Sequence, residues 1–599
     1  MLTLLRKSYS RGLTYLYPYS ILDQHLVKRY SQPKVIINMN EVCIVHDEDS
    51  DNFQVSLRYV NNDLNIDRQF NFRRTMNEPI NNFLRRLDLN INNCITKKRK
   101  KGNKRKGTDD INSTENTVDN IETKMIKLMK NNSDLDGNVS WKTMLEDPSN
   151  IKLIIFDTEY MFKRNVPSVT KIQLPSCILV GFPAYPSTFV SQYVDKTKST
   201  FNWYKYEGGK RIHVGEGYVY TPKLSDMGCK LKVSCIPRNN DQIGPMIEVV
   251  SNGVVEAGPG PCPFETRHTF TQSNLSGKSF RVTSYNILAG VYSETGFSKE
   301  TLYPYCPQYA LSKNYRKLLI LKELIGYNAD IICLQEVDLK VYEDDLVPFL
   351  STLNYNGICN LKNESREGLA IFYNRDRFDQ LDSNFSIIAH DTDSNDFNTT
   401  WLQIQNDNVK QMFVDRNTII QAIALKSKEN SEILIVGNTH LYFRPNADHI
   451  RLLQAYYCLI YLQTFAQETK LKNPECNVSI LYCGDFNSSP ENGIYQLMTQ
   501  KLIPEDYADW KSCPEQIIEN VTLKHDINLS SACGTPEFTN YTSTFSGCLD
   551  YIFYQTDYLG VEQVIPMPSK EELSLHTGLP SVVFPSDHIS LCVDLKWIK

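Results

Sequence analysis

Residues 478–487 read VSILYCGDFN and decide the fold of this chain. Apolar residues lead up to Asp485, and Asn487 follows two positions later. A short apolar run bounded by polar residues is typical of a buried strand. Further apolar runs with polar side chains at one end occur in RVTSYNIL (281–288), ADIICLQEV (329–337), EILIVGNTHLYF (432–443), LDYIFY (549–554) and SDHISLCVDLKWI (586–598).

Helical patterns separate these runs. Residues 312–327 place Leu318, Leu321 and Leu324 on one face at helical spacing. Residues 449–470 show a second, longer amphipathic pattern. Because buried strands that alternate with helices indicate a layered domain, we predict an α/β domain over residues 271–599.

The preceding region has the pattern of strands. In FQVSLRY (53–59) and KLKVSC (230–235) apolar and polar residues alternate, the period of a half-buried strand. Gly and Pro punctuate these runs, which favours an antiparallel sandwich. The stretch EAGPGPCPFETRH (256–268) is rich in Gly and Pro and is interpreted as a linker. We therefore predict a β-rich N-terminal domain over residues 33–270.

A basic and polar insertion interrupts this β-rich region near residues 95–145. Eight Lys and Arg side chains occur between Lys97 and Lys106, and TDDINSTENTVDN follows. The basic block is compatible with a nuclear signal or an RNA-binding arm. We prefer the simpler interpretation, a solvated and disordered insertion.

The overall composition excludes several classes of protein. The chain has 599 residues, with 64 Lys and Arg against 69 Asp and Glu, so its formal net charge is −5. It is therefore not a basic nucleic-acid coat. No stretch approaches the roughly 18–20 apolar residues of a membrane-spanning helix, so we expect no membrane insertion. The 16 cysteines lack C-x-x-C spacing, which favours free thiols.

Residues 1–32 have the composition of a targeting segment. Arg6, Lys7 and Arg11 are interleaved with Leu, Tyr and Ser, and the first acidic residue is Asp23. A basic, hydroxyl-rich and acid-poor start is typical of a mitochondrial transit peptide. We therefore expect a mitochondrial matrix location. An ordinary N-terminus with no address is the alternative.

Polar side chains at the ends of the predicted strands carry the candidate chemistry. We expect all of them to fall at or just beyond strand C-termini, where a sheet brings distant segments together. Mg²⁺ prefers oxygen ligands and needs only one or two carboxylates besides substrate phosphate. Imidazoles stabilise charge on phosphate oxygens. The set therefore suits metal-assisted phosphoester hydrolysis, and it comprises Asn286, Glu336, His440, Asp485, Asn487, Asp550, Asp587 and His588.

Single motifs of this kind are weak, but their joint occurrence in order is not. The motifs SYNILAG, GYNADIICLQEVD, EGLAIFY, NTHLYF, CGDFNSSP, GCLDYIF and FPSDHISLCVDLKW resemble the exonuclease–endonuclease–phosphatase superfamily of Mg²⁺-dependent phosphodiesterases. Within it they resemble the deadenylase-like branch, and IPEDYADW (503–510) resembles a mitochondrial member. The resemblance implies a four-layer α-β-β-α sandwich behind a mostly β, sandwich-like N-terminal domain.

The resemblance also implies roles for individual residues. Glu336 matches a metal-ligand glutamate. Asp485 and Asn487 match the pair that orients the attacking water and contacts metal or phosphate, with Asp485 as the proton acceptor. Asn286 matches an asparagine near metal and phosphate. The remaining matches are His440 and His588 holding the scissile phosphate, Asp550 orienting His588, and Asp587 near the metal.

Residues outside these motifs are further candidates. Arg416, Asn417 and the aromatic residues Tyr442 and Phe443 would suit the phosphates and bases of a single strand, although rim packing explains the aromatics equally well. One position departs from the family. Related sequences commonly have an acidic residue where this chain has Gly290, which puts a local loop contact in doubt.

By resemblance the substrates are oligoadenylates with 2′,5′ linkages and 3′,5′ poly(A) tails of mitochondrial RNA, and the product is 5′-AMP. A strict 3′,5′ poly(A)-specific deadenylase, a lipid phosphodiesterase and a non-catalytic RNA-binding scaffold are the alternatives. Retention of the whole acidic and histidine set argues against the scaffold. The sequence identifies no protein partner.

Overall fold

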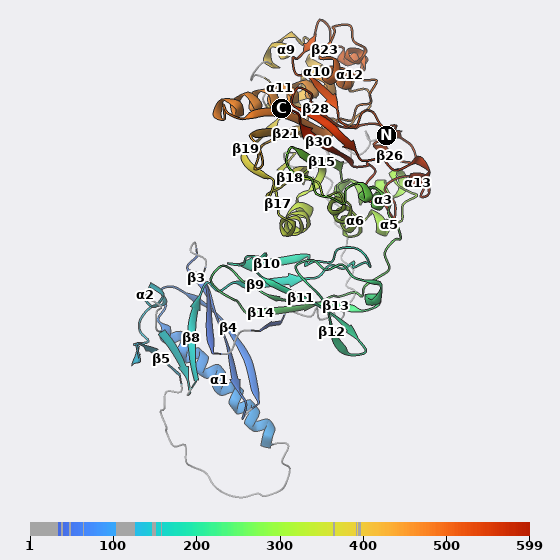
Figure 1. Cartoon of the computed structure of the whole chain (residues 1–599). Coiled ribbons are helices and arrows are strands. Elements are labelled where there is room, and N and C mark those ends of the chain that lie inside the picture. Colours follow the sequence, from blue (N-terminus) through green and yellow to red (C-terminus); the bar gives the residue numbers. More distant parts are fainter. Residues whose placement is uncertain are drawn as a thin grey trace, which may run out of the picture.

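The computed structural model describes residues 34–36, 40–46, 50–63, 65–103, 126–146, 151–156, 158–362, 366–390, 392 and 397–599. They form three units, which Figure 1 shows one below another. We call them the C-terminal domain (271–599), the middle unit (166–256 together with strand β1, Lys34–Ile36) and the N-terminal unit (40–165). The predicted transit peptide, residues 1–32, lies outside the described residues.

Two six-stranded sheets build the C-terminal domain. The first has the order β17 (Tyr355–Leu361), β18 (Glu367–Asn374), β16 (Ile331–Asp338), β15 (Ser279–Asn286), β30 (Leu591–Trp597) and β29 (Leu559–Val564). The second has the order β19 (Phe378–Ile387), β20 (Ile419–Ser427), β21 (Glu432–His440), β22 (Asn477–Asp485), β28 (Asp550–Gln555) and β25 (Leu529–Ser531).

The two sheets pack face to face, with helices on their outer faces. Val282, Leu434 and Leu481 belong to the apolar core between the sheets. Helix α6 (Lys313–Gly326) packs outside the first sheet, and α11 (Asp448–Lys472) outside the second. The four-layer α-β-β-α architecture is confirmed. It arises because the central strands are largely buried on both faces, so each sheet needs a cover on each side.

Strand direction decides which ends meet at the site. Strands β15 and β16 run parallel to each other, as do β21 and β22. Strands β28 and β30 run antiparallel to β22 and β15, so their first residues reach the edge where those strands end. The expectation that all candidates follow strand C-termini is therefore wrong for Asp550, which begins β28, and for Asp587 and His588, which precede β30.

The middle unit is a β sandwich packed on the C-terminal domain. A five-stranded sheet of order β1, β14 (Met246–Val250), β13 (Lys230–Ile236), β11 (Thr200–Glu207) and β12 (Lys210–Glu216) faces the pair β9 (Ser168–Gln173) and β10 (Thr188–Gln192). Trp203 is fully buried in its core. Tyr185 donates to Asp345 at 2.7 Å, and Lys317 of α6 contacts the same Asp345 oxygen at 2.7 Å. One apolar core therefore continues from the sandwich into the C-terminal domain.

The N-terminal unit has its own core. Its seven-stranded sheet has the order β4 (Ile66–Thr75), β3 (Asn52–Asn61), β2 (Glu41–His46), β8 (Thr158–Arg164), β7 (Ile151–Ile155), β5 (Ile126–Lys130) and β6 (Ser133–Asp134). Helix α1 (Ile80–Asn103) covers one face with Phe83, Leu87 and Ile91. The prediction of a mostly β N-terminal region is confirmed.

The predicted insertion near 95–145 needs a correction. Its first residues continue helix α1 to Asn103, and residues 126–146 are folded as β5, β6 and α2 (Trp141–Glu146). Leu128 and Trp141 are buried in the core, which explains why this part is ordered. Most residues of the segment are polar, so the few apolar residues that enter the core gave no recognisable strand or helix pattern in the sequence. The rest of the basic and polar stretch, 104–125, lies outside the described residues.

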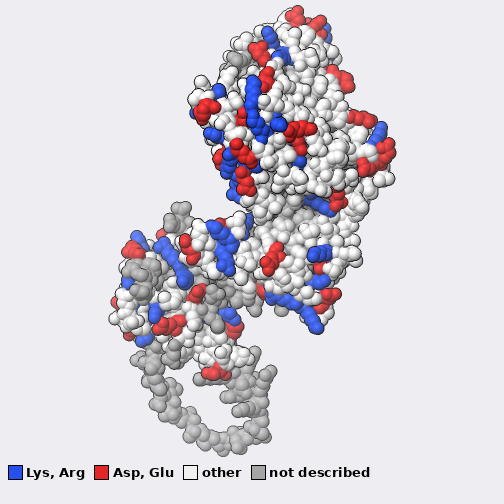
Figure 2. All heavy atoms as spheres, viewed as in Figure 1, with Lys and Arg blue, Asp and Glu red and all other residues white. Residues whose placement is uncertain are grey.

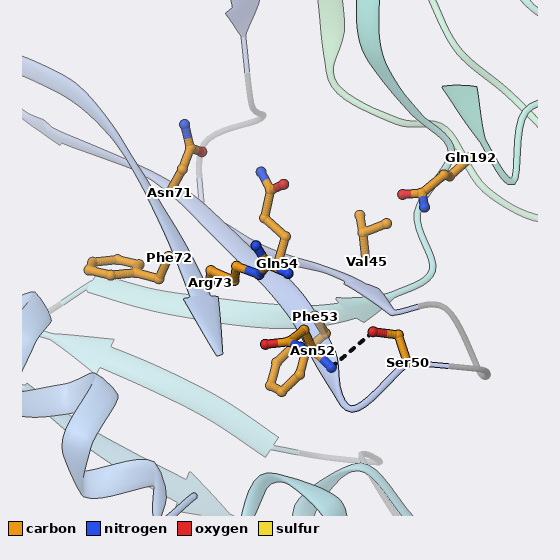
Figure 3. A pocket seen from close by; sticks show the side chains of 9 residues that line it. All are labelled: Val45, Ser50, Asn52, Phe53, Gln54, Asn71, Phe72, Arg73 and Gln192. Atoms are coloured by element: carbon orange, nitrogen blue, oxygen red, sulfur yellow. Dashed lines mark hydrogen bonds between the residues drawn. The ribbon is translucent and has the colours of Figure 1, made fainter. Parts of the chain in front are cut away.

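A shallow groove of about 580 Å³ lies between the N-terminal unit and strand β10 (Figure 3). Gln54, Asn71, Arg73 and Gln192 are among its lining residues. Basic and acidic side chains are interspersed over the face shown in Figure 2, in keeping with the small net charge. Among the described residues no helix is long and apolar enough to cross a membrane.

Candidate active site

The side-chain amide of Asn286 joins two acidic residues from the two sheets. Its Nδ2 donates to Glu336 Oε1 at 3.1 Å and to Asp485 Oδ2 at 3.0 Å. The Asn286 Oδ1 accepts from the backbone N–H of Leu288 at 3.0 Å, which fixes the orientation of the amide. The predicted residues of β15, β16 and β22 therefore meet, although they lie up to 199 positions apart.

Glu336 occupies an unusual backbone conformation. Its φ is +55°, and the pairing of β16 with β18 is irregular between Leu334 and Val337. A non-glycine residue in the left-handed region costs about 1–3 kcal/mol and is typical of functional sites. The bulge turns the Glu336 carboxylate toward Asn286, and its second oxygen accepts from the backbone N–H of Ala289 at 3.0 Å.

The two predicted histidines converge on Asp485. The distances to Asp485 Oδ2 are 3.5 Å from His440 Nε2 and 3.6 Å from His588 Nε2. The Nδ1 of His588 lies 2.8 Å from Asp550 Oδ2, as the sequence motif implied. Thr539 donates to the same Asp550 oxygen at 2.5 Å. One oxygen of Asp550 thus holds the His588 ring and is itself held by the Thr539 hydroxyl.

Different partners give the two imidazoles opposite charges. Burial and the Lys362 ammonium lower the pKa of His440 well below its usual value, so its ring is neutral. Burial also opposes a charge on His588, but Asp550 and Asp485 outweigh it and raise the pKa of His588 well above its usual value. The site therefore pairs one neutral imidazole with one imidazolium.

Burial raises the pKa values of both central acids. Desolvation, followed by repulsion from Asp587 and Glu367, raises the pKa of Glu336 to about 7. Desolvation raises the pKa of Asp485 to about 6, against the attraction of His588. Strongly shifted pKa values are concentrated in functional sites. Acidic groups buried close together destabilise a fold, so their presence here points to a function.

The other predicted residues lie around this centre. The backbone N–H of Asn487 donates to Asp485 Oδ1 at 2.9 Å, and its side chain donates to the carbonyl of Leu441 at 3.1 Å. Asp587 Oδ2 accepts from the hydroxyl of Tyr303 at 2.8 Å. Their roles toward metal or phosphate stay predictions.

Arg416 packs against an aromatic residue of the NTHLYF motif. Its guanidinium lies 4.7 Å from the centre of the Tyr442 ring. Tyr442 is buried, whereas Phe443 and Asn417 are exposed. The structure therefore gives Tyr442 a packing role, and substrate binding by Arg416 and Asn417 stays a prediction.

Residues that sequence reasoning missed support this centre from outside. Lys362 lies 3.1 Å from His440 Nδ1 and 3.3 Å from Glu367 Oε1. Buried Arg316 donates to the carbonyls of Ile287 and Leu288, which follow Asn286, and to that of Pro585, which precedes Asp587. Glu367 belongs to the motif EGLAIFY, which offered a signal, and Tyr303 lies in the segment LYPYC (302–306). Lys362 and Arg316 belong to no motif that marks them.

The acidic pair fits a divalent cation. Glu336 and Asp485 are close, buried or partly buried, and share one neutral amide, so their charge is poorly compensated. Oxygen donors of this kind match a hard cation. Asp485, Asp550 and His588 also cluster within 4.8 Å. A cation does not suit that cluster, because the His588 ring is an imidazolium engaged with Asp550.

The fold and the site define the class of protein. The family model described as the Endonuclease/Exonuclease/phosphatase family matches residues 283–588, so the chain belongs to this family. The matched segment contains every residue of the centre described above. The protein is therefore an enzyme of this hydrolase family.

More particular similarities extend beyond that domain. A family model described as the 2′,5′-phosphodiesterase 12-like N-terminal domain matches residues 166–256, the middle unit. The chain is 40% identical to 2′,5′-phosphodiesterase 12 of Homo sapiens over 469 residues, which cover 74% of this chain and 76% of the relative.

Two further comparisons each cover about half of the chain. The chain is 31% identical to the CCR4-Not complex 3′-5′-exoribonuclease subunit Ccr4 of Schizosaccharomyces pombe over 362 residues, or 54% of this chain and 50% of the relative. The crystal structure of ANGEL2, a 2′,3′-cyclic phosphatase, has 24% sequence identity and a TM-score of 0.45, and covers 54% of this chain and 97% of that one.

Proposed function

We propose that the protein is a Mg²⁺-dependent phosphodiesterase that hydrolyses 2′,5′-linked oligoadenylates and 3′,5′ poly(A) ends of RNA, releasing 5′-AMP. The observation that carries this proposal is the convergence of Asn286, Glu336, Asp485 and His588 in one centre. The similarity to 2′,5′-phosphodiesterase 12 supports the 2′,5′ linkage, and the similarity to Ccr4 supports 3′,5′ exonuclease activity.

Glu336 would hold the metal, with Asp485 and Asn487 nearby. A bound Mg²⁺ supplies charge neutralisation at the phosphate oxygens. We assign Asp485 as the acceptor of a proton from the attacking water, because burial raises the pKa of this carboxyl group and makes it more basic than an exposed aspartate. The backbone N–H of Asn487 orients this carboxylate.

The two imidazoles bind the phosphate from one side. The Nε2 atoms of His440 and His588 both face Asp485 Oδ2, so both can donate to one phosphoryl group beside it. The water oxygen forms the new bond to phosphorus, and the bond to the ribose oxygen breaks. That oxygen leaves as a 2′- or 3′-hydroxyl after it takes up a proton.

Product analysis tests the proposal. Purified protein is incubated with 2′,5′- and 3′,5′-linked triadenylate, with Mg²⁺ and with EDTA, and AMP is quantified. We expect AMP from both substrates only with Mg²⁺. Turnover of the 3′,5′ substrate alone would indicate a strict deadenylase. RNA binding without any AMP would contradict hydrolysis and favour a scaffold.

We also propose that the enzyme works in the mitochondrial matrix on mitochondrial RNA. The basic, acid-poor composition of residues 1–32 supports this location. Imaging of residues 1–32 fused to a reporter tests it. A nuclear or diffuse signal would contradict the proposal.

A further inference from the structure

The two histidines of the centre are held from behind by groups of opposite charge. His588 Nδ1 faces the carboxylate of Asp550 at 2.8 Å. His440 Nδ1 instead faces the ammonium of Lys362 at 3.1 Å. The two Nε2 atoms nevertheless point to the same Asp485 oxygen, at 3.5 Å and 3.6 Å. The two rings therefore differ in the group that contacts Nδ1, an acid for His588 and an ammonium for His440.

Lys362 is built into the protein rather than lying loose on its surface. Its side chain is 13% exposed and pairs with Glu367, which is 3% exposed, at 3.3 Å. The same Glu367 oxygen accepts from the hydroxyl of Tyr292 at 3.1 Å. Three elements, α4 (Gly290–Ser293), β18 and the segment after β17, thus hold the ammonium against the ring.

The chemistry of the ammonium decides the tautomer of His440. A Lys Nζ has three N–H donors and no acceptor. A ring nitrogen at hydrogen-bond distance from it must therefore be the acceptor and carry no proton. The single proton of a neutral imidazole then resides on the other nitrogen. For His440 that nitrogen is Nε2, the atom that faces Asp485.

We propose that Lys362 is a positioning residue that fixes His440 in its Nε2–H tautomer, so that the ring donates a hydrogen bond to a phosphate oxygen. This inference rests on the phosphodiester hydrolysis proposed above. Lys362 itself acts through the ring and does not touch the substrate. In the other tautomer a nitrogen lone pair would face the phosphate and repel it.

The first test compares Lys362→Met with Lys362→Arg on the full chain. Loss of one preorganised donor costs on the order of 10²-fold in kcat in other hydrolases. We expect a decrease of that order in kcat for Lys362→Met, with KM nearly unchanged, and partial recovery in Lys362→Arg. Lys317→Met is the matched control, because Lys317 is equally buried and pairs with Asp345 away from His440. An increase in KM with unchanged kcat would overturn the proposal.

A double-mutant cycle separates an effect through His440 from direct binding. If Lys362 acts only through the ring, Lys362→Met adds no further loss in a His440→Ala background. Independent losses that multiply would contradict the proposal. Both outcomes use the same substrate and the same assay.

A measurement without substrate keeps this inference apart from the proposed function. In ¹⁵N-histidine-labelled full-length protein, the His440 signal is assigned by its loss in His440→Gln. We expect an unprotonated Nδ1 and a protonated Nε2 in the wild type, and a shift toward the other tautomer in Lys362→Met. A protonated Nδ1 in the wild type overturns the inference even if the enzyme hydrolyses oligoadenylates. The expected tautomer without any AMP release would instead reject only the proposed function.

Discussion

Glu336 and Asp485 share the two donors of one asparagine amide, and this arrangement explains their chemistry. Neither acid is balanced by a lysine or arginine side chain at ion-pair distance among the described residues. Asn286 provides hydrogen bonds without charge, so the centre keeps an excess of negative charge that a cation can satisfy. A lysine in place of Asn286 would neutralise part of this negative charge and weaken the attraction for a cation.

Replacement of Glu336 by Gln tests the metal site at the scale of one residue. We expect AMP release to fall at least about 10³-fold, because the variant loses a charged ligand of the cation. The fold should survive, since Gln keeps the acceptor for Ala289. Activity and circular dichroism are the measurements. Glu343→Gln, at an exposed position of the same domain, is the control, and full activity of Glu336→Gln would contradict the assignment.

The raised pKa values predict how the metal-free protein responds to pH. The folded state binds a proton at Glu336 up to about pH 7, whereas the unfolded chain releases it near 4.5. Between these values the folded state holds more protons than the unfolded state, so stability falls as pH rises. In EDTA we expect the Tm of Glu336→Gln to exceed that of wild type by a margin that grows from pH 4.5 to pH 7. A margin that stays constant or shrinks would be inconsistent with the shift.

At the scale of elements, helix α6 organises the site without contributing a reacting group. Arg316 on this helix also donates to Ser293 Oγ and the carbonyl of Leu311, in addition to the three loop carbonyls. Arginine suits this role because its fork of donors can satisfy several fixed acceptors at once. The helix therefore sets the relative position of β15 and the segment before β30.

Removal of this guanidinium should affect stability and activity together. In Arg316→Met the buried acceptors lose their donor, which we expect to cost about 2–4 kcal/mol. The kcat should fall as well, because Asn286 and His588 lose their common support. Urea unfolding and steady-state kinetics measure both effects. Arg211→Met, at a partly exposed arginine of the middle unit, should leave both unchanged.

Gly290 begins the short helix α4 and lies against an acidic side chain. The backbone N–H of Gly290 donates to Asp338 Oδ2 at 2.7 Å, and a Cβ at Gly290 would lie 3.0 Å from that oxygen. Asp338 already supplies a carboxylate at this point. A second carboxylate would repel the first.

Gly290→Asp tests this account. We expect a loss of roughly 1–2 kcal/mol from the like-charge contact and the crowding. Asp338→Asn in the same background should recover part of the loss, because one of the two charges is removed. Thermal unfolding of the single and double variants measures this. Equal stability of Gly290→Asp and wild type would show that the contact is unimportant.

At the scale of the whole molecule, the middle unit and the C-terminal domain share one apolar core. Lys322 of α6 lies 4.2 Å from the centre of the Phe182 ring, next to the buried contact between Tyr185 and Asp345. A fragment of residues 257–599 would expose this interface. The N-terminal unit has a separate core, and among the described residues its apolar cluster with the middle unit is the small pair of Cys43 and Val166.

Truncation should therefore have unequal effects. We expect fragment 166–599, which loses only the three-residue edge strand β1 from the middle unit, to stay monodisperse and active. We expect fragment 257–599 to melt several degrees lower or to aggregate. Size-exclusion chromatography and thermal unfolding distinguish these outcomes. The point variant Tyr185→Phe should destabilise the full chain by about 1 kcal/mol, because one buried hydrogen bond is lost. Equal stability of the two fragments would contradict a structural role for the interface.

Helix α1 shows why some elements were missed. Its buried residues Phe83, Leu87 and Ile91 have helical spacing, but asparagines and basic residues surround them and weaken the pattern. Similarly, Trp141 is a single anchor in a polar segment. Such elements form because they pack on the apolar face of a neighbouring sheet. The local sequence of the element itself does not show that this face is present.

The apolar runs determined the layered α/β domain, and the motifs at their ends determined the family and the eight candidate residues of the centre. Strand burial and the polar side chains of such a site are both visible in the local sequence. Tertiary structure alone decided which strands run antiparallel, how Glu336 turns at a bulge, and that Lys362 meets His440 from 78 positions away. Contacts of this kind depend on the path of the backbone between distant segments. They leave no periodic pattern, so only the folded arrangement reveals them.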